Sequence, residues 1–187
     1  MTDPNDFPER RGAVIFDRDG TLNEDVGYAY RPDQIVWIED AAKAVRAVNE
    51  AGLFAFVATN QSGVARGYYT EEEVKALHRW MYLQLIDKGA RVDAFLFSPF
   101  HPEATVDAYR RASDCRKPGP GMVLDLMARF PIDPARTVMI GDKDSDVEAA
   151  RAAGIAGYKY EGGSLLKFVQ PLLARIAAGP AVTGGPS

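Results

Sequence analysis

The sequence predicts an α/β fold: a doubly wound parallel sheet with helices on both faces. Short apolar runs alternate along the chain with longer amphipathic segments, which is the pattern of strands joined by helices. The runs lack the apolar–polar alternation of half-exposed strands, so each strand is expected to be buried on both faces. Together these observations indicate a parallel sheet between two helical layers.

In the first half of the chain, the elements follow from short local patterns. Branched residues make Ala13–Asp17 (AVIFD) a buried strand, and Leu53–Ala58 (LFAFVA) is the next strand. Between them, Asp40–Gly52 has apolar residues at helical spacing and ends on glycine, a common helix stop. Thr70–Gly89 is predicted as a long helix because it opens with a capping box, a threonine followed three residues later by a glutamate.

The second half continues the alternation after a proline-rich loop at residues 99–118. The predicted elements are a strand at Val92–Ser98, a helix at Gly119–Phe130, a strand at Arg136–Asp142, a helix at Ser145–Gly154, a strand at Ile155–Tyr160 and a final helix that opens with Ser164–Gln170. We expect residues 1–178 to form one domain without a large cap, and residues 179–187 to be a disordered tail.

Composition excludes several classes of protein. The net charge of −4 gives no reason to expect nucleic acid or an anionic membrane as a partner. A lone cysteine, Cys115, rules out an internal disulfide framework and suits a reducing compartment. The first residues lack the apolar core of a secretory signal, and the apolar runs are too short to span a bilayer. We therefore expect a cytoplasmic protein, a monomer, that acts on a small molecule.

Polar side chains follow four of the predicted strands, where ligands of such folds bind. They are Asp17 and Asp19, then Thr59, then Arg116 and Lys117, and finally Asp142, Asp144 and Asp146. Carboxylates brought together repel one another unless a cation binds, and oxygen ligands without histidine or thiolate favour Mg²⁺. Mg²⁺ usually completes its shell with water and phosphate, which the cations and the hydroxyl also suit.

This chemistry predicts phosphate transfer through an aspartate. Asp17 can act as a nucleophile that forms an aspartyl-phosphate, and Asp19 can protonate the leaving oxygen and later activate water. Both side chains can reach one cavity only if the chain leaves strand geometry after Asp17, and Gly20 permits such a turn.

Four motifs in order resemble those of the haloacid-dehalogenase superfamily of phosphatases: DRDGTLN, the strand exit at Thr59, Lys117 and GDKDSD. The resemblance extends from Ala13 to about Lys167, and the motif spacing leaves no room for a cap domain. It implies that Asp17 is the nucleophile and Asp19 the acid/base, and that Thr59 and Lys117 hold the phosphoryl group. It also implies that Mg²⁺ is bound by Asp17, the backbone carbonyl of Asp19 and Asp142.

Longer strings, DRDGTLNEDVGY, TNQSGVARGYYTE and DCRKPGPGM, resemble a subgroup whose members act on heptose bisphosphates or on histidinol phosphate. The resemblance implies removal of one phosphate from a heptose bisphosphate during synthesis of activated heptose for surface polysaccharide. The alternatives are a phosphatase for histidinol phosphate or another small phosphoester, and a non-catalytic phospholigand-binding protein. The implied substrate contacts are Asp25, Val26, Gly27, Tyr28, Asn60, Gln61, Ser62, Arg116 and Lys143.

One loop departs from that subgroup, which often holds a structural zinc ion through Cys-x-His and Cys-x-Cys. The matching positions here are Ser98, Phe100, Ser113 and Cys115, so three of the four ligands are missing. Hydroxyl and phenyl groups do not make a tetrahedral zinc site, and we predict that the loop folds without zinc. One equivalent of zinc per chain, measured by elemental analysis after dialysis, would contradict this prediction.

Overall fold

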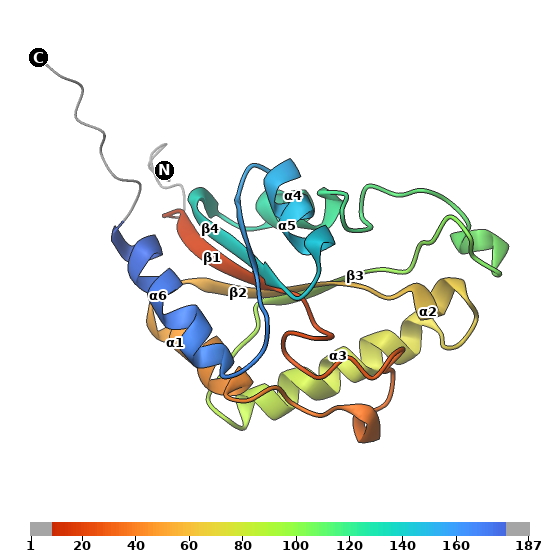
Figure 1. Ribbon diagram of the computed structural model, residues 1–187, viewed down its shortest axis with the longest axis horizontal. Helices are drawn as coiled ribbons and strands as arrows, with labels where there is room; N and C mark the ends of the chain where they lie inside the picture. The colour runs from red at the N-terminus through yellow and green to blue at the C-terminus, as the bar shows by residue number, and fades with distance from the viewer. Residues whose placement is uncertain (1–8, 179–187) are drawn as a thin grey trace, which may run out of the picture.

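The computed structural model describes residues 9–178, in which five parallel strands form one sheet in the order β3–β2–β1–β4–β5 (Figure 1). The strands are β1 (Arg11–Phe16), β2 (Phe54–Asn60), β3 (Ala94–Ser98), β4 (Ile132–Gly141) and β5 (Ala156–Lys159). The helices are α1 (Ala41–Glu50), α2 (Ser62–Ala65), α3 (Glu71–Ile86), α4 (Gly121–Arg129), α5 (Asp144–Ala152) and α6 (Leu165–Ala178). Two 3-10 turns lie at Pro32–Gln34 and Asp107–Tyr109.

The side chains of the central strand β1 are buried on both faces of the sheet. Val14 and Phe16 pack with α1 and α6 on one face, whereas Ala13 and Ile15 pack with α4 and α5 on the other. All four side chains are fully buried. Figure 1 shows α4 and α5 on one side of the sheet and α1, α3 and α6 on the other. The predicted doubly wound fold is confirmed, and no large cap is evident among the described residues.

Strand β4 differs from its prediction because it begins at Ile132 instead of Arg136. Ile132 pairs with Arg11, and the register then shifts before Thr137 pairs with Ala13. Pro134 lies inside this irregular stretch, where a missing backbone donor is tolerated. The predicted strand therefore began four residues too late.

The order of the strands brings their carboxyl ends to one edge of the sheet. Two long connections cross this edge: residues 17–40, between β1 and α1, and residues 99–120, between β3 and α4. No helix in the range 9–178 is long and apolar enough to cross a membrane. The predicted single domain over residues 1–178 stays a prediction, and the predicted disordered tail at 179–187 lies outside the described residues.

Candidate active site

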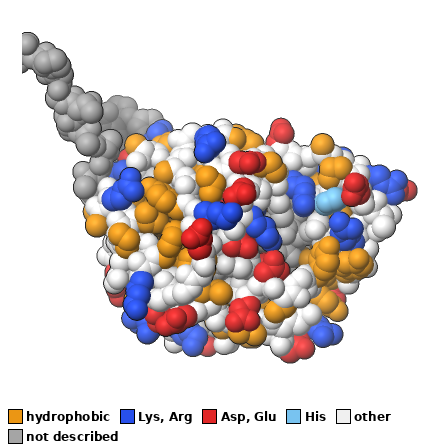
Figure 2. Space-filling view, viewed as in Figure 1, with side chains coloured by type: hydrophobic (Ala, Val, Ile, Leu, Met, Phe, Trp, Pro, Cys, Tyr) orange, Lys and Arg blue, Asp and Glu red, His pale blue; other side chains and the backbone are white. Residues whose placement is uncertain are grey.

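A cavity of about 470 Å³ opens at the carboxyl ends of the strands. Charged side chains of both signs gather around the hollow that Figure 2 shows on this face. The lining residues are Asp17, Asp19, Asp25, Gly27, Tyr28, Thr59, Asn60, Gln61, Ser62, Tyr69, Arg116, Lys117, Lys143 and Ser145. The structure therefore brings together most of the residues that the sequence pointed to, from four strand exits and two long connections.

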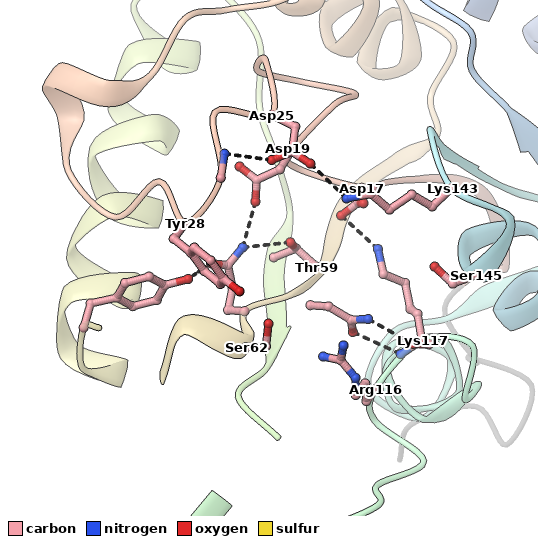
Figure 3. A pocket seen from close by; sticks show the side chains of 14 residues that line it. Asp17, Asp19, Asp25, Tyr28, Thr59, Ser62, Arg116, Lys117, Lys143 and Ser145 are labelled. Carbon is pink, nitrogen blue, oxygen red and sulfur yellow. Dashed lines mark hydrogen bonds and ion pairs between the residues drawn. The ribbon is translucent and has the colours of Figure 1, made fainter. Parts of the chain in front are cut away.

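Asp17 and Lys117 form the centre of the cavity (Figure 3). Asp17 directly follows β1 and is 5% exposed, and its Oδ1 accepts a hydrogen bond from the backbone N–H of Arg18 at 2.7 Å. Lys117 Nζ lies 2.8 Å from the same Oδ1 and donates to the carbonyl of Ala58 at 2.9 Å. The hydrogen bonds that described residues donate to Asp17 all go to Oδ1, which leaves Oδ2 for a reacting group.

Asp146 is a second buried partner of Lys117. Its Oδ1 lies 2.6 Å from Lys117 Nζ, although the two groups are not aligned as a hydrogen bond. Its Oδ2 accepts the backbone N–H of Lys143 at 3.0 Å, at the start of α5. This geometry places Asp146 where it can orient Lys117.

The carboxylates of Asp17, Asp142 and Asp146 approach one another closely enough to hold a cation. Oxygen atoms of the three groups lie within 4.8 Å of one another. Burial raises the pKa of Asp142, and the nearby Asp17 and Asp146 add to this effect while Lys143 opposes it. Asp142 Oδ1 is buried without a hydrogen-bond partner among the described residues. These oxygen donors fit Mg²⁺.

Gly20 makes this approach of the carboxylates possible. Its φ of +82° lies in the left-handed region that favours glycine. A Cβ atom at this position would lie 2.5 Å from Cγ of Asp142, so any side chain would push that carboxylate away. The turn after Asp17 therefore depends on glycine for both its backbone conformation and its space.

Asp19 lies beside this centre, in a network of donors. Its carboxylate accepts from the fully buried guanidinium of Arg18 at 2.8 Å, from Asn23 Nδ2 at 2.9 Å and from Gln61 Nε2 at 2.9 Å. Arg18 Nη1 also lies 3.4 Å from Nε2 of His78 in α3. Burial and the adjacent Arg18 hold the pKa of His78 well below its usual range, so the imidazole is neutral and can accept from Arg18.

Three of the four predicted substrate contacts in the connection between β1 and α1 line the cavity, and one does not. Asp25 forms an ion pair with Lys143 at 3.0 Å, and Gly27 and Tyr28 line the cavity. Partial burial raises the pKa of Asp25, but the hydrogen bonds from Lys143 and from the backbone N–H of Gly27, together with nearby positive charge, outweigh it, so the pKa is lowered. Val26 is 50% exposed and does not line the cavity.

Asn60 and Arg116 place the other connection against the sheet. The side chain of Asn60 forms two hydrogen bonds with the backbone of Lys117. Its Oδ1 accepts from the N–H at 3.0 Å, and its Nδ2 donates to the carbonyl at 2.9 Å. Arg116 is half-buried and donates to the carbonyl of Phe100 at 3.2 Å. Burial, followed by the charge of Arg66, lowers the pKa of Arg116. No ion pair with a described carboxylate occupies Arg116, which suits it to an anionic ligand.

The loop at residues 99–118 is anchored by contacts with α2 and α3. The backbone N–H groups of Thr105 and Val106 both donate to the carbonyl of Ala65 at 3.0 Å, and the Tyr109 hydroxyl donates to Glu71 at 2.9 Å. At the positions that matched zinc ligands, Ser98 is buried, and Phe100, Ser113 and Cys115 lie in the loop, with Cys115 exposed. These contacts explain how the loop keeps its shape, while the absence of zinc stays a prediction.

Sequence reasoning missed Tyr69 and Ser145, which line the cavity, and the role of Arg18 beside Asp19. Tyr69 follows α2 rather than a strand, so the strand-exit rule gave no signal for it. Arg18 stands between the two aspartates of DRDG, and no sequence pattern indicated its contact with Asp19.

Comparisons with known proteins agree with this geometry. A family model described as HAD-hydrolase-like matches residues 114–167. The chain is 49% identical over 164 residues to the D-glycero-β-D-manno-heptose-1,7-bisphosphate 7-phosphatase of Rhodopseudomonas palustris, covering 88% of this chain and 91% of the relative. It is 41% identical over 143 residues to the protein of the same name from Escherichia coli K12, covering 76% and 75%.

Two solved structures share the fold. The crystal structure of a HAD-like protein from Mesorhizobium loti has a TM-score of 0.83 at 31% identity and covers 94% of this chain and 91% of its own. The D,D-heptose 1,7-bisphosphate phosphatase of B. bronchiseptica, solved in complex with magnesium and phosphate, has a TM-score of 0.76 at 29% identity, with 88% and 99% covered.

Proposed function

Because the chain belongs to the D-glycero-β-D-manno-heptose-1,7-bisphosphate 7-phosphatase family of HAD-like hydrolases, we propose that it removes the 7-phosphate of a heptose 1,7-bisphosphate. The observation that carries the proposal is the Asp17–Lys117 pair, set in a cavity whose wall also holds Arg116, a cation that forms no ion pair with a carboxylate in residues 9–178. The product would be a heptose 1-phosphate, which a later reaction could activate with a nucleotide.

We propose a reaction in two displacements at phosphorus. Asp17 Oδ2 attacks the 7-phosphoryl group, the bond between phosphorus and the sugar oxygen breaks, and Asp19 delivers a proton to that oxygen. A water molecule then attacks phosphorus and gives a proton to Asp19, and the bond between phosphorus and Asp17 breaks to release inorganic phosphate. Asp17 and Asp19 thereby return to their starting states.

The remaining residues of the centre hold the phosphoryl group. Lys117 Nζ and the hydroxyl of Thr59 are the donors available to its oxygens, in a buried site where such interactions are strong. Asp17 and Asp142, with the backbone carbonyl of Asp19, would hold Mg²⁺. Bound Mg²⁺ would neutralise charge on the carboxylates and on the phosphoryl oxygens.

Arg116 supports a bisphosphate as the substrate. A second phosphate, away from Asp17, can pair with the guanidinium, which is well suited to phosphate geometry. Histidinol phosphate carries an ammonium group instead, and Arg116 would repel it. The ion pair of Asp25 and Lys143, together with Tyr28, would enclose the sugar between the two phosphates.

The experiment is a comparison of substrates with the purified protein and Mg²⁺. The α and β anomers of heptose 1,7-bisphosphate and histidinol phosphate are supplied separately, and the products are identified by ³¹P NMR. We expect loss of the 7-phosphate signal, retention of the 1-phosphate signal, and no reaction in the presence of EDTA. Faster turnover of histidinol phosphate, or release of the 1-phosphate, would contradict the proposal.

We also propose that the chain works as a monomer in the cytoplasm. The lone cysteine of the sequence, Cys115, is exposed and suits a reducing compartment. Light scattering after size-exclusion chromatography tests the oligomeric state, and a dimer mass would contradict it.

A further inference from the structure

We infer that Tyr69 is a positioning residue for Asp19 and Thr59, and that it acts through the side-chain amide of Gln61. This inference rests on the proposed phosphatase function, because it assigns a task to two groups of the same site. It also changes the expected role of Gln61, which the sequence had suggested as a substrate contact.

Gln61 makes four hydrogen bonds that fix the direction of its amide. Oε1 accepts from the Tyr69 hydroxyl at 2.8 Å and from Arg18 Nη2 at 3.2 Å. Nε2 donates to Asp19 Oδ2 at 2.9 Å and to Thr59 Oγ1 at 3.0 Å. A guanidinium can only donate, so the reversed amide would turn its own N–H groups toward Arg18 and lose that bond. The side chain is 2% exposed, which leaves water little access as a substitute partner.

The amide of Gln61 also sets the polarity of Thr59. Because Thr59 Oγ1 accepts from Gln61, its own hydrogen is free to be donated elsewhere. Hydrogen bonds among the described residues use Thr59 Oγ1 only as an acceptor, and Thr59 lines the cavity. The hydroxyl is therefore prepared as a donor for a phosphoryl oxygen.

Tyr69 is itself held firmly, which allows it to hold Gln61. Its ring stacks on Tyr30 with centroids 5.0 Å apart, and it lies against Gly63, where an added Cβ atom would collide with it. Burial raises the pKa of Tyr69 to about 12, so its hydroxyl keeps its proton and remains a donor to Gln61 across the physiological pH range. Tyr69 also contributes to a small apolar cluster with Val64 and Val74.

Removal of the Tyr69 hydroxyl would leave Oε1 of Gln61 with only the longer bond to Arg18. Arg18 would still face Oε1, so the amide would keep its direction but be held less firmly, and Asp19 and Thr59 would each have a less fixed donor. Asp19 acts on the leaving group, so the loss is expected in kcat, while substrate affinity should change little. We expect Tyr69→Phe to lower kcat by about 3- to 10-fold, the range that one neutral hydrogen bond supports.

The test is a double-mutant cycle with Tyr69→Phe, Gln61→Leu and the combined variant, each checked for folding by its melting temperature. The inference predicts that Gln61→Leu lowers kcat at least as much as Tyr69→Phe, and that Tyr69→Phe has no further effect in the Gln61→Leu background. Tyr160→Phe is the matched control, because it removes the hydroxyl of a buried tyrosine that donates to the carbonyl of Gly163 outside this network, and it should leave kcat unchanged.

Each variant is assayed on heptose 1,7-bisphosphate and on p-nitrophenyl phosphate. A wild-type protein that hydrolyses p-nitrophenyl phosphate but not heptose 1,7-bisphosphate would contradict the proposed substrate and not this inference. The inference is overturned by a wild-type kcat in Tyr69→Phe, by a rise in KM without a fall in kcat, or by the same fold-loss in both backgrounds. The ¹⁵N–¹H signals of the Gln61 side-chain amide provide a readout without activity: they should shift in Tyr69→Phe and not in Tyr160→Phe.

Discussion

The ammonium group of Lys117 lies 2.8 Å from the carboxylate of Asp17, and both side chains are almost completely buried. Lys117 comes from the loop before α4, whereas Asp17 directly follows β1, so the pair joins that loop to the central strand of the sheet. Asp146 completes the arrangement at 2.6 Å from the same ammonium. The ammonium group of Lys117 is thus the shared counter-ion of two buried carboxylates.

Loss of Lys117 should therefore cost stability as well as activity. We expect Lys117→Met to lower the free energy of unfolding by about 3–5 kcal/mol, because Asp17 and Asp146 lose their buried counter-ion. The double variant Lys117→Met/Asp146→Asn should regain part of that loss but stay inactive. Urea denaturation and phosphate release measure the two effects. A Lys117→Met protein as stable as wild type would refute the charge balance described here.

Replacement of Gly20 should weaken the metal site. In Gly20→Ala the new Cβ displaces the Asp142 carboxylate, so the Mg²⁺ concentration for half-maximal activity should rise by at least about 10-fold, equivalent to about 1.4 kcal/mol of lost metal binding. Gly154→Ala is the matched control: its φ is also positive, at +78°, but a Cβ there meets nothing within 4 Å. It should lose about 1–2 kcal/mol of stability with no change in Mg²⁺ dependence. Equal Mg²⁺ dependence in the two variants would contradict the steric argument.

Arg116 should determine how well a second phosphate is bound. Arg116→Ala is expected to raise KM for heptose 1,7-bisphosphate by about 10- to 100-fold, as expected from loss of a hydrogen bond to a charged group. Its kinetics on p-nitrophenyl phosphate, which has one phosphate, should be nearly unchanged. Arg111→Ala is the control from the same loop, because Arg111 stacks on Phe100 and does not line the cavity. A proportional loss on both substrates would argue against a second phosphate at Arg116.

His78 should make the protein less stable in mild acid. Its pKa in the folded protein lies well below the usual 6.5, so below pH 6.5 the unfolded chain binds a proton that the folded chain does not. The free energy of unfolding should fall with pH below 6.5, by up to about 1.4 kcal/mol per pH unit from this residue. His78→Gln removes that component, so its urea denaturation should depend less on pH between about pH 7 and pH 5. Identical pH dependence in both proteins would be the contrary result.

The convergence of Asp17 and Asp142 could be predicted from the sequence because it follows from topology alone. The residues that follow parallel strands meet at one edge of the sheet, and β1 and β4 are neighbours. The fold class was predictable for the same reason, since the alternation of apolar and amphipathic segments determines the layers.

Other features depend on side-chain geometry that no spacing rule contains. Val26 belongs to the same string as Asp25 and Tyr28, yet it is exposed and does not line the cavity. Tyr69 reaches Gln61 across a turn that is possible only because Gly63 leaves space for its ring. The early start of β4 could not be predicted because Pro134 is accommodated by a shift in register.

The most direct test of the account is to look for phosphate on Asp17 during turnover. The wild-type protein and Asp17→Asn are mixed with heptose bisphosphate labelled with ³²P at the 7-phosphate, quenched in acid, and digested. We predict label on the peptide that contains Asp17 in the wild type, and neither label nor phosphate release in Asp17→Asn. Continued phosphate release by Asp17→Asn at the wild-type rate would contradict the central claim.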